Sequence, residues 1–170
     1  AFTGDTEMTQ MFLSRGCEVN AVAASNAGAF ALYFAAQHGR AEVVQLLIAS
    51  GADVNMSTGH VELVSGAEAG CTALHQACCR GYVDVVIALV AAGADVNAAC
   101  TLEGTQGYTP LLCSCRQYHD RIPQLLLAAG AQVNAELETG ETAMALACKG
   151  GHLQLMQLLV DSGARASPED

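Results

Sequence analysis

Apolar residues recur along this chain at helical spacing, in segments that each end at a glycine. The segment AEVVQLLIASG places its valines and leucines three and four residues apart and ends at Gly51. The segments DVVIALVAAG, ending at Gly93, and LQLMQLLVDSG, ending at Gly163, repeat the arrangement. This spacing puts the apolar side chains on one face of a helix, and a glycine readily adopts the left-handed conformation that ends one. The pattern therefore predicts three amphipathic helices.

In three places a shorter apolar segment that begins at a threonine lies between one such glycine-ended segment and the next. These segments are TALHQACCRG from Thr72, TPLLCSCRQY from Thr109 and TAMALACKGG from Thr142. Threonine is a common N-cap, and Pro110 is suited to the first helical position. We therefore predict pairs of helices, a short one followed by a longer one.

The turn that follows the longer helix also repeats. Its five versions are GCEVN (16–20), GADVN (51–55), GADVN (93–97), GAQVN (130–134) and GARAS (163–167). Successive glycines lie 35, 42, 37 and 33 residues apart. A period of this size is typical of stacked supersecondary units.

One unit, GCTALHQACCRGYVDVVIALVAAGADVN (70–97), resembles an ankyrin repeat, whose pattern is G-x-T-P-L-H-x-A-A-x-x-G-H, an apolar helix and then G-A-D-V-N. The resemblance covers nearly all 170 residues, and we predict a single domain, 1–170. It comprises a partial unit 1–20 and full units at about 21–55, 56–97, 98–134 and 135–167. It implies an all-α solenoid of stacked helix-turn-helix units with β-turn or hairpin fingers.

Some units depart from this pattern. The first full unit has Phe30 where the capping threonine is expected and Tyr33 where the histidine is expected, so that only His75 occupies the histidine place. The unit 98–134 has Tyr118 in place of the glycine between its helices and Pro123 in the first turn of its second helix. We expect this unit to be locally distorted.

Composition and charge narrow the possible functions. Apolar residues make up 52% of the chain, which favours a packed core over disorder. The formal charge of −10 would repel a phosphate backbone, so nucleic acid is not expected as the principal partner. The longest uncharged apolar segment, 27–36, is too short to cross a bilayer, which needs about 20 residues.

Three of the eight cysteines, Cys78, Cys115 and Cys148, occupy the same place in their units. We expect this place to face the neighbouring unit, where free cysteine packs as a small apolar residue. Neighbouring helices lie about 8–10 Å apart, whereas a disulfide needs Cα atoms within about 7 Å. Abundant unpaired thiols indicate a reducing compartment, and therefore an intracellular location in the cytoplasm or nucleus.

The stretch around His75 raises the question of metal binding or catalysis. We interpret His75 as a structural histidine that bonds near the Thr72 cap. Adjacent residues on a helix point about 100° apart, so Cys79 points away from Cys78, and no second Cys/His pair has zinc-finger spacing. Neither a metal nor a cofactor is predicted. An enzyme using Cys79 or Cys71 would need a base and an orienting group in one cleft, which a linear array does not obviously supply, so we predict no enzymatic activity.

The resemblance implies that a protein or peptide partner docks on the concave side, formed by the fingers and the exposed ends of the first helices. The places in this chain that match those positions, and that we predict to bind a partner, are Gln37, His38, Cys79, Arg80, Tyr108, Arg116, Gln117, Glu141 and Lys149. The alternative is a structural spacer or scaffold segment of a larger protein, such as a ubiquitin-ligase adaptor or signalling scaffold.

Three of the seven basic residues, Arg80, Arg116 and Lys149, fall at the ends of successive first helices. A cation near a helix C-terminus is stabilised by the helix dipole, by about 0.3–1 kcal/mol, so this row has a structural explanation as well as a functional one. The functional one predicts an acidic or carboxylate-bearing ligand, with Tyr108 as an aromatic anchor.

Further expectations concern the turns and the ends. The insertion 56–69 either contacts a partner or is neutral. Asn55, Asn97 and Asn134 either bond the turn between units or, by resemblance, are sites of hydroxylation. The apolar face of segment 1–16 has no first helix beside it, from which we expect the chain to be part of a longer array.

Overall fold

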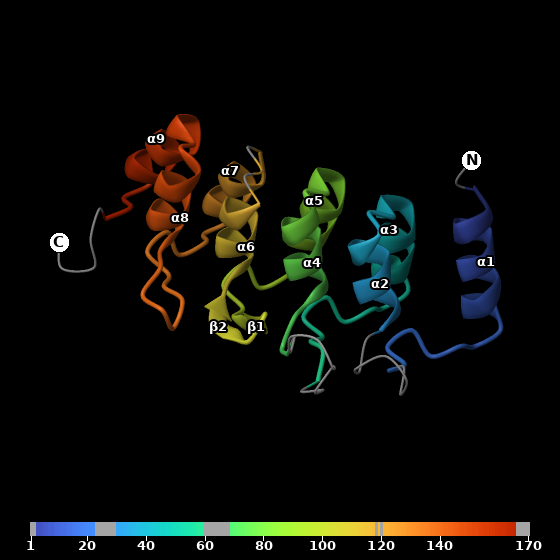
Figure 1. Ribbon diagram of the computed structural model, residues 1–170. Helices are drawn as coiled ribbons and strands as arrows, with labels where there is room; N and C mark the ends of the chain where they lie inside the picture. Colours follow the sequence, from blue (N-terminus) through green and yellow to red (C-terminus); the bar gives the residue numbers. More distant parts are fainter. Residues whose placement is uncertain (1–2, 23–29, 60–68, 118, 120, 166–170) are drawn as a thin grey trace.

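Short helices stand side by side in a row, and the loops and the hairpin between units lie along one side of this row, at the same end of the helices (Figure 1). The computed structural model describes residues 3–22, 30–59, 69–117, 119 and 121–165. The elements are α1 (Thr3–Ser14), α2 (Ala31–Gln37), α3 (Ala41–Ala49), α4 (Ala73–Arg80), α5 (Val83–Ala91), β1 (Cys100–Leu102), β2 (Thr105–Tyr108), α6 (Pro110–Arg116), α7 (Arg121–Ala128), α8 (Ala143–Gly150) and α9 (Leu153–Asp161).

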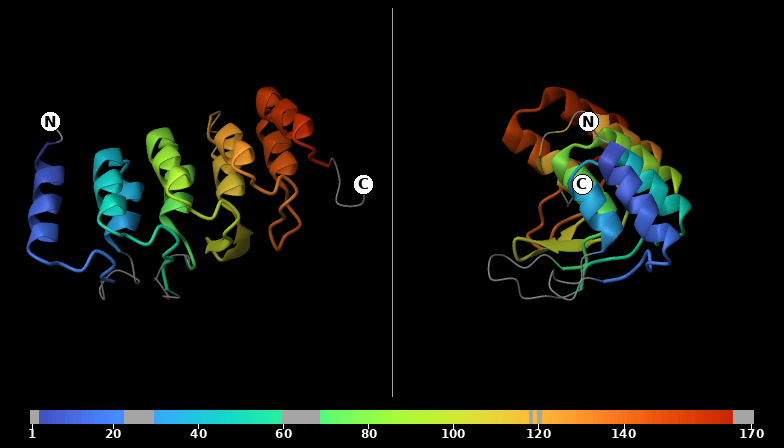
Figure 2. Two further views of the ribbon diagram at one scale, coloured as in Figure 1. Left: turned by 180° about the vertical axis from the view of Figure 1, so that it is seen from behind. Right: turned by 90° about the vertical axis from the view of Figure 1, so that its right-hand side faces the viewer.

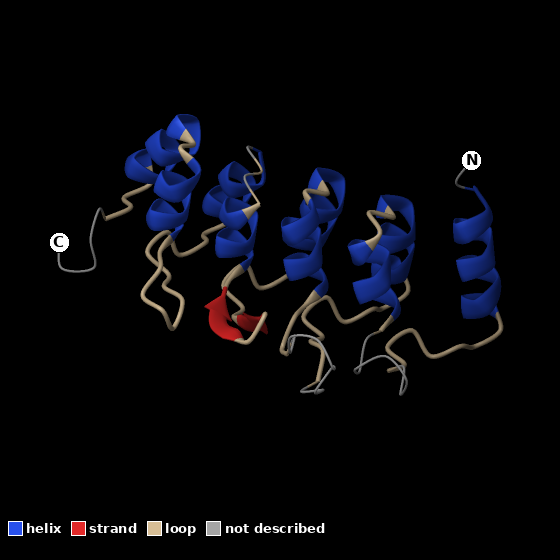
Figure 3. Cartoon of the chain, in the orientation of Figure 1, coloured by secondary structure: helices blue, strands red, loops and turns tan. Residues whose placement is uncertain are grey.

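The helices form pairs, and the pairs stack. Each first helix packs against the second helix of its own unit: α2 on α3, α4 on α5, α6 on α7 and α8 on α9. The first helices also pack on one another along the row, and α1 packs on α3 in the manner of a second helix (Figure 3). Seen along the row, β1 and β2 extend to one side of the helix ends (Figure 2). The predicted all-α solenoid of stacked helix pairs with hairpin fingers is confirmed.

The predicted apolar stripes form the core. The most buried positions of the second helices are Val44, Leu47, Val85, Val86, Leu89, Ile122, Leu126, Leu155 and Leu159. Full burial of one such side chain stabilises the fold by about 1.5–3 kcal/mol. The glycine after each stripe ends the helix as predicted; Gly93, for example, has φ +86°, which other residues adopt only with strain. No helix within the described ranges is long and apolar enough to cross a membrane.

The first helices begin where the threonines predict. Thr109 accepts a hydrogen bond from the Leu112 N–H at 3.3 Å, and Thr142 accepts one from the Ala145 N–H at 3.2 Å. Pro110 follows Thr109 at the first helical position. Phe30, in contrast, makes no side-chain cap for α2. These differences follow directly from the residue at each N-cap.

The expected distortion of the unit 98–134 can be followed only in part. Pro123 lies in the first turn of α7 and is buried, so its missing N–H falls where a helix has no internal partner for one. Tyr118, which replaces the glycine between the two helices, lies outside the described residues.

Asparagines join successive units through their turns. The Asn55 amide donates to the Gly93 carbonyl at 3.3 Å, and its oxygen accepts from the Asp95 N–H at 2.7 Å. Asn20, Asn97 and Asn134 make the same pair of bonds to the following turn. The interpretation of these asparagines as turn-bonding residues is therefore confirmed.

Neighbouring fingers are also linked to one another. Ala69 and Thr101 exchange backbone hydrogen bonds at 3.1 and 2.8 Å, and the Glu138 N–H donates to the Gln106 carbonyl at 3.1 Å. Thr58 and Ala69, which flank most of the predicted insertion, are buried in this layer. Positions 60–68, on which a contact role for the insertion depends, lie outside the described residues.

The first helix, α1, leaves part of its apolar face exposed. α1 packs on α3, and Arg40 Nε lies 3.3 Å from the Asp5 carboxylate. Met8, Met11 and Phe12 remain 57%, 42% and 48% exposed, as expected for a helix without a paired first helix. A longer array remains a prediction.

Candidate functional site

Four of the predicted binding residues line one pocket between α4 and α6. These four are Cys79, Arg80, Arg116 and Gln117, and the remaining lining residues are Gln76, Leu102 and Glu103. The last turns of the two helices supply the first group, and the turn between β1 and β2 closes the pocket from the finger side. We call this site the α4–α6 pocket.

Arg116 is held in place on both sides of its guanidinium group. Its Nη2 donates to Glu103 at 2.6 Å, and the guanidinium carbon lies 5.6 Å from the centre of the Tyr108 ring. The hydrogen bond to Glu103 raises the pKa of Arg116. Glu103 reaches this position from a left-handed backbone conformation, with φ +51°, at the tip of the hairpin. The arginine is thus oriented toward a carboxylate of its own chain.

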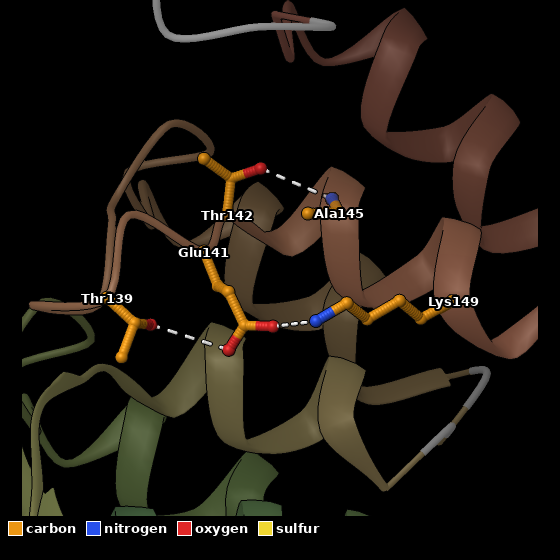
Figure 4. A network of polar contacts seen from close by, with 5 residues as sticks. All are labelled: Thr139, Glu141, Thr142, Ala145 and Lys149. Carbon is orange, nitrogen blue, oxygen red and sulfur yellow. Dashed lines mark hydrogen bonds and ion pairs between the residues drawn. The ribbon is translucent and has the colours of Figure 1, made fainter.

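Lys149 has the same kind of partner one unit further along. Its ammonium group forms an ion pair with Glu141, whose other oxygen accepts from the Thr139 hydroxyl at 3.4 Å (Figure 4). The hydrogen bond from Lys149 lowers the pKa of Glu141, and the same bond raises the pKa of Lys149. Both residues were predicted to bind a partner, and the structure brings them together outside the α4–α6 pocket.

The three cations of the predicted row therefore differ. Arg116 and Lys149 each share charge with a glutamate from the finger of their own unit. Arg80 is exposed and forms no ion pair with any described residue. The fingers place glutamates beside two of the three cations, and no described carboxylate neutralises the third, Arg80.

Tyr108 supports the pocket from within the protein. Its side chain is buried, with 7% exposure, and burial raises the pKa of its hydroxyl group. The ring lies under the Arg116 guanidinium, a geometry in which the aromatic face attracts a cation. Tyr108 therefore positions Arg116, and its buried ring is not an open surface for a partner.

Gln37 and His38 lie away from the α4–α6 pocket, at the end of α2. His38 Nδ1 donates to the Phe34 carbonyl at 2.9 Å. His38 also lines two hollows beside α1, together with Asp5 and Arg40. The structure thus divides the predicted binding residues among three places along the row.

His75 is a structural residue, as predicted. It is fully buried, and its Nδ1 accepts from the Thr72 N–H at 3.2 Å. Its Nε2 lies 3.0 Å from the carbonyl oxygens of Ala98 and Tyr108, which can only accept. The ring is therefore the neutral tautomer with the proton on Nε2, and it joins α4 to the next finger. Among the described residues no group of three His, Cys, Asp or Glu side chains could hold a metal ion.

All eight cysteines are free thiols. Cys78 and Cys115 are fully buried between first helices, which confirms their predicted packing role. Burial raises the pKa of Cys78 well above its usual value and raises the pKa of Cys115 to about 12. Cys148 was expected to be buried in the same way, and this was wrong. It is exposed, because no described helix packs on that side of α8.

A group of four thiols was missed by the sequence analysis. Cys71, Cys100 and Cys113 are buried and Cys79 is half-buried, and the thiols of Cys100 and Cys113 influence the pKa of one another. The thiol donors lower the pKa of Cys100, whereas the same contact raises that of Cys113. We call Cys71, Cys79, Cys100 and Cys113 the thiol cluster. Spacing along the chain gave no signal for it, because two fingers and two helices supply its members.

Comparison with known proteins identifies a family for this chain and no specific partner. A family model described as ankyrin repeats (3 copies) matches residues 1–100 and residues 98–170. No curated protein matches the chain. The matched segments together cover the stacked helix pairs and fingers described above. The chain therefore belongs to the ankyrin repeat family.

Proposed function

We propose that this chain is a protein-interaction module whose α4–α6 pocket binds an acidic segment of a peptide or folded partner. Ankyrin repeats are generally protein–protein interaction modules and are typically non-catalytic. The observation that favours this site is Arg80, which is exposed and forms no ion pair with the described residues, beside an oriented Arg116 in one pocket. On a chain with a net charge of −10, an arginine that no described carboxylate neutralises favours a negatively charged ligand at this place.

The pocket contains the groups that recognition of a carboxylate needs. Arg80 can form charge-assisted hydrogen bonds to a ligand without breaking an ion pair to any residue that the structure describes. Arg116 has five N–H donors, so it can donate to a ligand while it keeps a hydrogen bond to Glu103. Weakening this ion pair would cost little, because an exposed ion pair contributes only about 0–1 kcal/mol. Leu102 supplies an apolar contact, and Gln76 and Gln117 supply amide groups.

The same surface continues to Lys149. First helices pack about 10 Å apart, so Arg80 and Lys149, two units apart, are separated by roughly 20 Å. An extended peptide of about six or seven residues covers that distance. The partner segment that fits is short and extended, with an acidic residue at the α4–α6 pocket.

The experiment is a selection from a library of random heptapeptides. Wild-type protein is expected to enrich sequences that contain Asp or Glu. Arg80→Glu should abolish this enrichment, whereas Arg121→Glu, the same charge change at an exposed position that does not line the pocket, should preserve it. Enrichment that survives Arg80→Glu would contradict the proposed site. A wild-type protein that selects nothing would favour the spacer or scaffold alternative.

We also propose an intracellular location, in the cytoplasm or nucleus. Its support is the set of eight free thiols, including the exposed Cys17 and Cys148, which would be prone to oxidation in a secreted protein. Fluorescence microscopy of the tagged protein tests this, and a secreted or lumenal signal would contradict it.

A further inference from the structure

The turn of the hairpin places a carboxylate of the chain itself at the α4–α6 pocket. Leu102 pairs with Thr105, so Glu103 and Gly104 form a two-residue turn between β1 and β2. Glu103 lines the pocket, and its carboxylate accepts a hydrogen bond from Arg116 Nη2 at 2.6 Å. The place that would receive a carboxylate of a partner thus already has one beside it.

The backbone of Glu103 is unusual for a glutamate. Both residues of the turn have a positive φ, +51° at Glu103 and +79° at Gly104, as a type I′ turn requires. Asparagine, aspartate and glycine are the usual residues at the first of these two positions, because other residues adopt the left-handed conformation with strain. Among the described residues other than glycine, only Glu103 has a positive φ. A residue held in such a conformation indicates a role for its side chain.

We propose that Glu103 is an internal competitor in the α4–α6 pocket, whose carboxylate holds the Arg116 guanidinium until the carboxylate of a partner takes its place. This inference rests on the proposed function, because a competitor acts only where an acidic ligand binds. Glu103 weakens binding in two ways: it occupies a donor of Arg116, and it repels a second carboxylate in the same pocket. The chain therefore limits its own affinity for acidic segments.

Glu103 can be displaced because its contact with Arg116 is exposed. The Glu103 side chain is 73% exposed, and that of Arg116 is 34% exposed. An exposed ion pair changes an equilibrium constant by at most about fivefold, or about 1 kcal/mol. The Tyr108 ring, whose centre lies 5.6 Å from the guanidinium carbon, makes a separate contact with Arg116. The arginine therefore stays beside the pocket when the carboxylate leaves it.

Three variants separate this contact from a general effect of charge. Glu103→Gln removes the charge and keeps the length of the side chain. Glu103→Asn also removes it and supplies the residue that the turn favours, so this variant should remain folded. Glu138→Gln is the matched control, because it removes the same charge from an exposed position of the next finger that does not line the pocket.

The first measurement uses no ligand, so it tests the contact independently of the proposed function. Phenylglyoxal modifies guanidinium groups, and peptide mass spectrometry gives the rate of modification at Arg116, with the exposed Arg121 as the internal reference. Glu103→Gln and Glu103→Asn should raise the relative rate at Arg116 by up to about fivefold. Glu138→Gln should leave it unchanged. A rate at Arg116 that is the same in wild type and in both Glu103 variants would overturn the proposal.

The second measurement is the affinity for a fluorescein-labelled oligoglutamate peptide, followed by fluorescence anisotropy. Both Glu103 variants should bind the peptide about fivefold more tightly than wild type, and Glu138→Gln should bind it as wild type does. If wild type binds the peptide and the Glu103 variants bind it no better, or if Glu138→Gln gains as much as they do, the competitor role is wrong and the proposed function stands. If neither wild type nor any variant binds the peptide, the proposed function fails, and the competitor role fails with it.

Discussion

Replacing His75 with leucine should destabilise the protein, mainly because buried polar groups lose their hydrogen-bond partner. Leu112 occupies the equivalent place in the next unit, so the fold accepts a leucine side chain there. The substitution removes the ring nitrogens that pair with the Thr72 N–H and with the carbonyls of Ala98 and Tyr108. Leaving a buried polar group unpaired costs about 1–3 kcal/mol.

Four groups lose their partner in this variant, because the Thr72 hydroxyl also bonds to Nδ1 of the ring, but Ala98 is only half-buried and water can replace part of its bond. We therefore expect a loss of about 3 kcal/mol in the free energy of unfolding. Urea unfolding followed by circular dichroism measures it, with His38→Leu as the control. His38 is exposed and makes one bond to its own helix, so its loss should stay within about 0.5 kcal/mol. A His75→Leu protein as stable as His38→Leu would refute the bridging role assigned to the ring.

Two further predictions concern the fingers. Gly107→Ala should lower the free energy of unfolding by about 3 kcal/mol, because φ is +93° and a Cβ atom would lie 2.9 Å from a backbone oxygen of the next finger. Gly104→Ala, at φ +79° with nothing within 4 Å, should lower it by only about 1 kcal/mol. Equal losses in urea unfolding would contradict this packing. Lys149→Gln should raise the pKa of Glu141 toward its usual 4.5, measured by carboxyl NMR titration. Because Lys149 lowers that pKa in the folded state, the pair stabilises the protein above about pH 4.5 and this contribution is lost as the pH falls through the lowered value. An unchanged titration of Glu141 would show that the pair does not form in solution.

The sequence predicts the helices and turns well because these depend on residues close together in the chain. The stripe around Val44 and Leu47, the Thr109 cap and the Asn55 bridge all follow from local spacing, which the repeat then copies into each unit. The same reasoning predicted that Cys148 is buried, which was wrong, because its burial depends on a further helix beside α8.

The charges of the site could not be predicted in this way. Arg116 and Lys149 were expected to form an open basic row, yet each is paired with a glutamate of its own finger. The pairing depends on the shape of fingers that differ in length between units, and on the left-handed conformation of Glu103.

The central claim is that the α4–α6 pocket recognises an acidic group through Arg80. Its most direct test is a calorimetric titration of a peptide selected by the wild-type chain against wild type, Arg80→Glu and Arg121→Glu, at low and high ionic strength. A charge-assisted contact in a pocket is expected to contribute about tenfold in affinity, or about 1.4 kcal/mol, and to weaken as salt rises. The account predicts at least a tenfold weaker affinity for Arg80→Glu only, and weaker wild-type binding at high salt. Equal affinities for all three proteins, unchanged by salt, would contradict it.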